Sequence, residues 1–222
     1  EVDSMAFSAD GKTLASGSDD NTLRVWNVDD GKAVKTLDKF EDRVAGLDYS
    51  PDGETLAAAS WEGKVVLFDA ATYEEKENIK SDGGGVDTVA FSPDGKLLLM
   101  GGTSGDLVMR DIAADKVVWE KEGEGTTARG ISFSPDGKQI AYTGAEETVR
   151  IANATDGTET QKMSGHKNYV EDVTFSPDGK RVAFVGTLHG DPVRSYADTL
   201  DADPARVRRL CGWDWINAAI GG

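Results

Sequence analysis

The side chains that could carry out chemistry in this sequence are few and far apart. There are two histidines, His166 and His189, and one cysteine, Cys211. His189 is close to Asp191 and Ser195, but nothing in the surrounding sequence orients these groups as a Ser–His–Asp nucleophile. The spacing of the histidines and the cysteine matches no zinc-ligand pattern. We therefore expect no catalytic residue, no cofactor site and no metal site built on these side chains.

A tetrapeptide that recurs every 42 residues identifies the elements that must position any functional group. It reads Ser-Pro-Asp-Gly in four copies and Ser-Ala-Asp-Gly in the first, and an aromatic residue precedes each copy. Proline at the second position and glycine at the fourth suit a tight turn between two strands. The five copies begin at Ser8, Ser50, Ser92, Ser134 and Ser176.

The segments between these turns predict four short antiparallel strands per repeat, which is typical of a β-propeller blade. We expect an all-β fold, with residues 1–222 as a single propeller or propeller segment whose ring is closed or open. The predicted blades span approximately 2–37, 44–79, 86–121, 128–163 and 170–210, and residues 212–220 begin a further blade. Residues 203–211 have two alternatives, the outer strand of the fifth blade, which we favour, or a helix that begins after Asp203.

The first repeat carries residues by which a known family can be identified. The segment from Phe7 to Trp26, which includes the turn residue Asp20, resembles the WD-repeat β-propeller family, and Gly165-His166 resembles the Gly-His pair of that family. The resemblance covers nearly the whole chain and implies structural hydrogen-bonding roles for His166, Asp20 and Trp26. The hydrogen-bond network that such residues form in the family is incomplete in every repeat here, so we expect divergent blades that depend on apolar stacking.

The charge of the chain restricts its partners. The formal net charge is −16, and such a surface repels phosphate groups, so we expect neither nucleic acid nor an anionic membrane as a partner. No apolar run approaches the length of a membrane span. The single cysteine does not assign a compartment, although a cytoplasmic location is favoured.

Large side chains in loops indicate where a partner could bind. The resemblance implies that the loops between blades and the turns between second and third strands form one face of the propeller. Trp61 is the most informative residue there, because its repeat equivalents Asp19 and Thr103 show no structural demand for an aromatic ring. Its alternative role is packing on a neighbouring blade. The expected partner-binding residues are Phe40, Arg43, Trp61, Lys167 and Tyr169.

These residues predict a non-catalytic scaffold for protein–protein interaction, since Trp, Tyr and Arg commonly anchor interfaces. A second hypothesis is a sensor or enzyme domain that binds a ligand or cation at the propeller axis. A third is a repeat segment of a multidomain regulator, and open blade edges could also support self-association. The first strands offer a mostly acidic set for the second hypothesis: Asp3, Asp48, Asp87, Arg129, Glu171 and Asp172.

Overall fold

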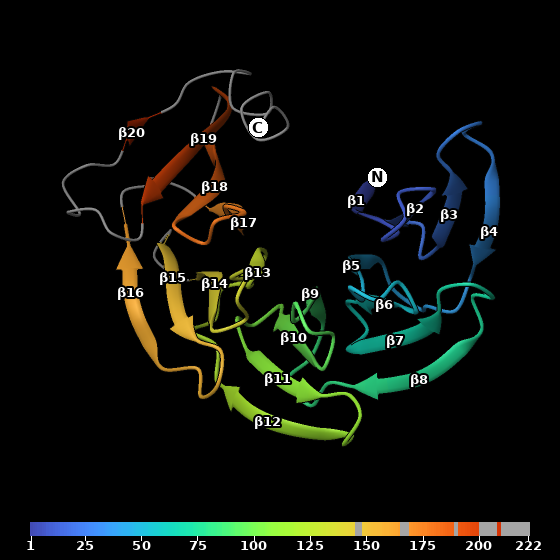
Figure 1. Ribbon diagram of the computed structural model, residues 1–222, viewed down its shortest axis with the longest axis horizontal. Helices are drawn as coiled ribbons and strands as arrows, with labels where there is room; N and C mark the ends of the chain where they lie inside the picture. Colours follow the sequence, from blue (N-terminus) through green and yellow to red (C-terminus); the bar gives the residue numbers. More distant parts are fainter. Residues whose placement is uncertain (145–147, 165–168, 189–190, 200–207, 210–222) are drawn as a thin grey trace. The chain divides into compact units, whose positions relative to one another are not determined.

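The computed structural model describes residues 1–144, 148–164, 169–188, 191–199 and 208–209, and the regular elements among them are β-strands (Figure 1). These strands form five antiparallel sheets of four strands, in which each strand pairs with the next along the chain. The predicted all-β fold of propeller-type blades is thus confirmed. Within the described part of the chain, no helix has the length and apolar character needed to cross a membrane.

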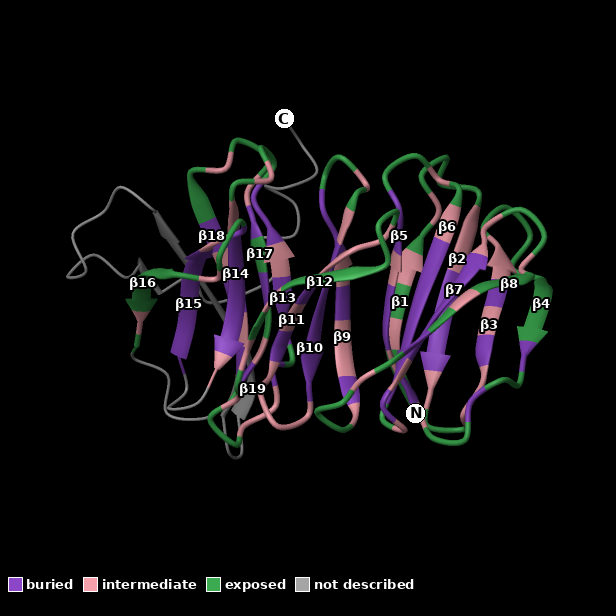
Figure 2. Cartoon of the chain, turned by 90° about the horizontal axis from the view of Figure 1, so that it is seen from below, coloured by how far each residue is buried: buried purple, intermediate pink, exposed green. Residues whose placement is uncertain are grey.

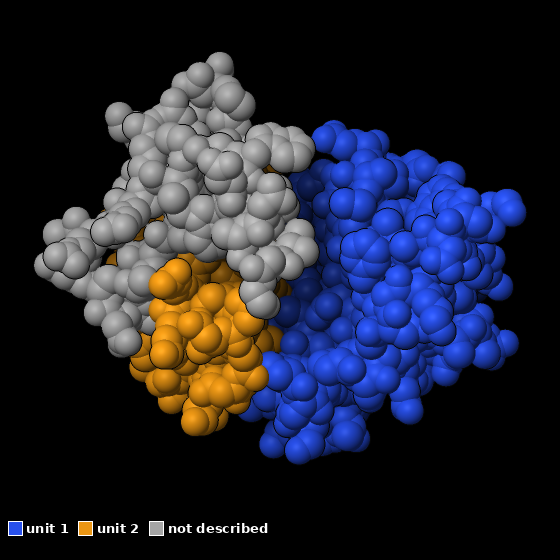
Figure 3. Space-filling model, turned by 45° about the horizontal axis from the view of Figure 1, so that its top comes forward, with its two compact units in different colours: residues 1–128 blue, residues 129–222 orange. Residues whose placement is uncertain are grey.

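The chain divides into two compact units, residues 1–128 and residues 129–222 (Figure 3). The first unit holds three sheets and the second holds two.

The strands of the first unit are β1 (Val2–Phe7), β2 (Thr13–Ser18), β3 (Leu23–Asn27), β4 (Ala33–Leu37), β5 (Val44–Tyr49), β6 (Thr55–Ser60), β7 (Lys64–Asp69), β8 (Glu75–Lys80), β9 (Val86–Phe91), β10 (Leu97–Gly102), β11 (Leu107–Asp111) and β12 (Lys116–Lys121). The strands of the second unit are β13 (Ile131–Phe133), β14 (Gln139–Gly144), β15 (Thr148–Asn153), β16 (Glu159–Met163), β17 (Val170–Phe175), β18 (Arg181–Leu188), β19 (Asp191–Thr199) and β20 (Arg208–Arg209).

Two parts of the sequence-based interpretation fall largely on residues that the structure does not describe. Of residues 203–211, only Arg208 and Arg209 are described, and they form β20, which pairs with β19. The predicted start of a further blade at 212–220 lies outside the described residues. The single domain over residues 1–222 and the blade bounds remain predictions.

The repeated tetrapeptide forms the same turn in all five copies. In each copy the glycine N–H donates to the serine carbonyl at 2.8 Å, and the glycine φ lies between 68° and 74°. The serine hydroxyl donates to the aspartate carboxylate, as in Ser92 to Asp94 at 2.7 Å. The carboxylate also accepts a backbone N–H beyond the turn, from Lys96 in this copy. These bonds close the hairpin between the first two strands of each blade.

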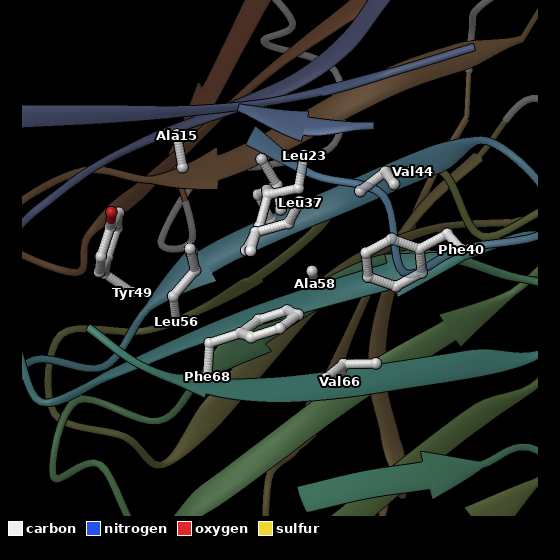
Figure 4. Close-up of a cluster of buried hydrophobic side chains, with 11 residues drawn as sticks. Ala15, Leu23, Leu37, Phe40, Val44, Tyr49, Leu56, Ala58, Val66 and Phe68 are labelled. Atoms are coloured by element: carbon white, nitrogen blue, oxygen red, sulfur yellow. The ribbon is translucent and has the colours of Figure 1, made fainter. Parts of the chain in front are cut away.

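Consecutive blades within a unit bury apolar side chains between their sheets. We call the front face of a blade the side that carries the apolar residues of its first strand, and the back face the opposite side. Leu23 on the back face of the first blade belongs to one buried cluster with Leu47, Leu56 and Phe68 on the front face of the second (Figure 4). The same arrangement joins the second blade to the third, and β14–β15 to β17–β18 in the second unit.

Two of the residues that the family resemblance marked as structural lie in the first blade. The indole Nε1–H of Trp26 donates to the Ser16 hydroxyl at 2.8 Å, which links β3 to β2. Asp20 accepts hydrogen bonds from Thr22 within the β2–β3 turn and pairs with Arg24 at 3.2 Å. The third residue, His166, lies outside the described residues.

Candidate protein-interaction surface

Trp61 and Arg43 meet at one end of the second blade because β5 and β6 run antiparallel. Arg43 directly precedes β5, Trp61 directly follows β6, and Val44 pairs with Ser60 between them. The Trp61 backbone N–H donates to the Arg43 carbonyl at 3.2 Å. The guanidinium of Arg43 lies over the indole, with Cζ 3.4 Å from the ring centroid. This geometry is a cation–π contact.

The neighbouring blades hold this pair in place. The indole Nε1–H donates to Asp87 Oδ1 on β9 of the third blade at 2.6 Å. Arg43 Nη2 lies 3.7 Å from the same oxygen, and Nη1 lies 3.4 Å from Asp19 Oδ1 in the β2–β3 turn of the first blade. We call Asp19, Arg43, Trp61 and Asp87 the tryptophan cluster. It connects all three blades of the first unit.

The tryptophan cluster leaves part of the indole accessible. Trp61 is 37% exposed, whereas the side chains of Arg43 and Asp87 are more deeply covered. One ring face is stacked and the ring nitrogen is hydrogen-bonded, so the exposed part of the indole has a defined orientation. Trp61 therefore contacts a neighbouring blade, which was the alternative role considered for it, and part of its indole is still exposed.

Acidic side chains surround the cluster. Glu41 and Asp42 lie in the loop before β5 and are exposed. Glu62 follows Trp61, and its carboxylate accepts the backbone N–H of Glu41 at 3.1 Å. Lys64 Nζ lies 3.8 Å from Glu62 and donates to the Lys39 carbonyl, so part of its charge is used locally. The region around Trp61 is predominantly negative.

The expectation that Phe40 lies on a binding face must be corrected. Its side chain is 7% exposed and belongs to the buried cluster between the first two blades. The ring packs edge-on against Phe68 with centroids 6.4 Å apart, and Lys64 Nζ lies 5.3 Å from its centroid. Phe40 is a loop residue that points inward because the two sheets leave apolar space there.

The remaining expected residues are in the second unit, so they are not assigned to the same surface as Trp61. Tyr169 is exposed just before β17, and Arg129 Cζ lies 5.3 Å from its ring centroid. Lys167 lies outside the described residues.

The acidic set considered for a cation is engaged with protein groups. Asp48 Oδ2 accepts the Phe91 N–H at 2.7 Å, and burial raises the pKa of Asp48 to about 6. Burial likewise raises the pKa of Asp172, whose carboxylate accepts the Val173 N–H. Arg129 and Glu171 form an ion pair at 2.9 Å.

At the edge of the first blade, the pKa of Asp3 is raised overall. Desolvation is the main cause, a hydrogen bond with Asp19 adds to it, and the charge of Arg43 opposes it. Among the described residues, no three His, Cys, Asp or Glu side chains are grouped to hold a metal ion.

Sequence reasoning missed the connection of Asp87 with Trp61. Asp87 was considered only as a cation ligand at the propeller axis. Its contact with Trp61 joins residues 26 positions apart in different blades, and no spacing rule within one repeat predicts it.

Comparison with known proteins identifies the repeats. Residues 1–27 and 31–69 match the family model "WD domain, G-beta repeat". Residues 89–178 match the model "Anaphase-promoting complex subunit 4 WD40 domain". A 48-residue segment is 40% identical to the general transcriptional corepressor TUP1 of Saccharomyces cerevisiae, which covers 22% of this chain and 7% of that protein.

Proposed function

Because this chain belongs to the WD-repeat family, whose repeats generally mediate protein–protein interactions, we propose that it is a non-catalytic scaffold that binds a protein partner through the tryptophan cluster. The similarity to a corepressor fits a scaffold role. The matched segment covers 7% of that protein.

The observation that carries this proposal is the fixed, partly exposed indole of Trp61. Tryptophan is enriched among the residues that dominate binding energy at interfaces. Binding is weakened when a mobile side chain must be ordered, and this cost is small for a ring already held by Arg43 and Asp87. The cluster thus presents a preorganised aromatic anchor.

The charge around the anchor favours a basic partner segment. Glu41, Asp42 and Glu62 border Trp61, and the chain has a net charge of −16. Complementary charge accelerates association and excludes partners of the same sign. We therefore propose a partner with lysine or arginine residues flanking an apolar group that contacts the indole.

Site-specific photo-cross-linking in cells tests the proposal. A photoreactive amino acid is placed at Glu41 or at Asp82, in the two loops beside Trp61, and a matched control is placed at Glu74. Glu74 is also exposed but lies in the β7–β8 turn, at the opposite end of the blade. We expect the same protein to be captured from both loop positions and not from Glu74.

Recovery alone does not support the proposal, so the captured protein is purified and its affinity for the unmodified chain is measured. Loss of affinity on Trp61→Ala supports the tryptophan cluster as the binding site. Equal capture from all three positions, or capture only from Glu74, would contradict it.

A further inference from the structure

The front face of the first blade is exposed at its first strand, whereas the corresponding strand positions of the other repeats are buried. The first-strand aromatic of each repeat is 6 to 9% exposed at Tyr49, Phe91, Phe133 and Phe175, whereas its first-repeat equivalent Phe7 is 61% exposed. Val2 and Met5 on the same strand are exposed as well. Figure 2 shows this contrast between β1 and the interior strands β6 and β7.

Apolar residues form a row across the front face of the first blade. Phe7 pairs with Leu14 and Leu14 pairs with Trp26, so the three side chains form a row across β1, β2 and β3. The matching row in the second blade is Tyr49, Leu56 and Phe68, which is buried under the first blade. The row of Phe7, Leu14 and Trp26 therefore matches the apolar row of a blade–blade interface. Ser16 and Arg24 lie beside it, at the positions that Ala58 and Val66 take in the second blade.

The interfaces within each unit show what covers a front face. In each case it is the back face of another blade, with a small residue on the second strand and a branched apolar residue on the third. Ala15 and Leu23 take these positions over the second blade, and Ala57 and Val65 over the third. Ala141 and Val149 do so in the second unit.

The back face of the β17–β18 sheet is also incompletely covered, and it is the kind of face that covers a front face within each unit. Ala183 lies at the back-face position of β18 that corresponds to Ala57 and Ala141, both of which are fully buried. Ala183 and its neighbour on the same face, Val185, are only half-buried. One chain thus offers a front face in its first sheet and a back face in its β17–β18 sheet.

We propose that the front face of β1–β3, formed by Val2, Met5, Phe7, Leu14 and Trp26, binds the back face of β17–β18 of a second copy of the chain. The contact is head-to-tail and continues the stacking that joins blades within each unit. Different surfaces meet across such a contact, so association extends beyond a dimer unless the copies close into a ring. This inference does not depend on the tryptophan cluster, which lies elsewhere on the blades.

Sedimentation velocity over about two orders of magnitude in protein concentration tests the contact. We expect the weight-average sedimentation coefficient to rise with concentration for the unmodified chain. Phe7→Asp buries a charge in the contact and should weaken association at least about tenfold. Phe7 is exposed within one chain, so the substitution should leave the circular dichroism spectrum unchanged.

Val34→Asp is the matched control. Val34 is a similarly exposed apolar residue, but it lies on the outer strand β4 and not in the row of Phe7. If the copies associate through the sheet face, the Val34→Asp variant should associate as the unmodified chain does. Association through the open outer edge instead would make Val34→Asp the more damaging change.

A mixing experiment tests the polarity of the contact. Phe7→Asp blocks only the front face, and Ala183→Arg blocks only the back face. An equimolar mixture still contains one intact face of each kind, so it should form dimers and nothing larger. A concentration-independent monomer of the unmodified chain, or equal effects of Phe7→Asp and Val34→Asp, would overturn the proposal. If Ala183→Arg fails to fold, Val185→Arg on the same back face takes its place in the mixture.

Discussion

The guanidinium of Arg43 stacks on the indole of Trp61, with Cζ 3.4 Å from the ring centroid. Arg43 precedes the β5–β6 hairpin and Trp61 follows it, so both lie at its open end, and both contact Asp87 in the next blade. A stacked cation and a hydrogen-bonded ring nitrogen fix the indole more strongly than either contact alone. The surface that we propose for partner binding is therefore also part of the contact between blades.

This coupling is measurable as a double-mutant cycle. We expect Arg43→Ala and Trp61→Ala to destabilise the chain non-additively, with a coupling of about 0.5–1 kcal/mol in the free energy of unfolding. Urea denaturation of the two single variants and the double variant measures it. Val118→Ala on β12 combined with Trp61→Ala serves as the control pair and should be additive. A coupling energy indistinguishable from that of the control would show that the stacking contributes nothing to stability.

The buried carboxyl of Asp48 makes stability depend on pH. Burial raises its folded-state pKa from 3.8 to about 6, so the folded chain binds more protons than the unfolded chain between these values. The Asp48 contribution is therefore most favourable at low pH and is lost as pH rises through about 6. Above that range the charged carboxylate destabilises the fold, by about 3 kcal/mol.

Asp48→Asn should remove this dependence, because an amide oxygen can still accept the Phe91 N–H. We expect the variant to be more stable than the unmodified chain at about pH 7.5, with the difference shrinking toward about pH 4.5. Urea denaturation across this range gives both curves. Parallel curves over the whole range would mean that Asp48 titrates normally.

The repeated turn predicts a backbone effect at Gly95. Its φ is 71°, and an added Cβ would meet only Pro51 Cδ at 3.7 Å. Gly95→Ala should therefore cost about 1 kcal/mol of unfolding free energy through the left-handed backbone conformation alone. Gly102→Ala is the control, because its Cβ would also meet neighbours at ordinary distances, the nearest at 3.5 Å, without a positive φ. Equal stabilities of the two variants would contradict this explanation.

The acidic surroundings of Trp61 predict a salt effect on partner binding. Raising the ionic strength should slow association with a basic partner, because screening shortens the range of attraction. Stopped-flow or surface-based kinetics at several salt concentrations measures the association rate. Glu41→Gln and Asp42→Asn together should reduce the slope of that rate against salt. A rate independent of salt would argue for an uncharged partner segment.

The strands and turns could be predicted from the sequence because each repeat carries its own turn chemistry. Proline, aspartate and glycine at fixed positions determine the hairpin locally, and all five copies adopt it. Trp61 could be singled out because it interrupts the repeat pattern, and Arg43 because it is a large side chain in a loop. Their connection through Asp87 could not be predicted, because it depends on how neighbouring blades stack.

The repeat pattern also could not predict which aromatic side chains are buried. Phe40 follows a blade in a loop, which favours an exposed position, yet it fills apolar space beside Phe68. Phe7 and Phe91 both directly precede a copy of the repeated turn, yet Phe7 is exposed where Phe91 is buried. Repeats that look alike in sequence differ in what covers them, and only the packing of whole sheets determines this.

The affinity of the photo-captured partner for Trp61→Ala tests the central claim most directly. Titration calorimetry compares this variant with the unmodified chain and with Val118→Ala, a truncation of an exposed apolar residue away from the cluster. We predict at least about a tenfold loss of affinity for Trp61→Ala, as expected for an aromatic anchor, and no change for Val118→Ala. An unchanged affinity for Trp61→Ala, in a chain that remains folded, would contradict the assignment of the tryptophan cluster as the partner-binding surface.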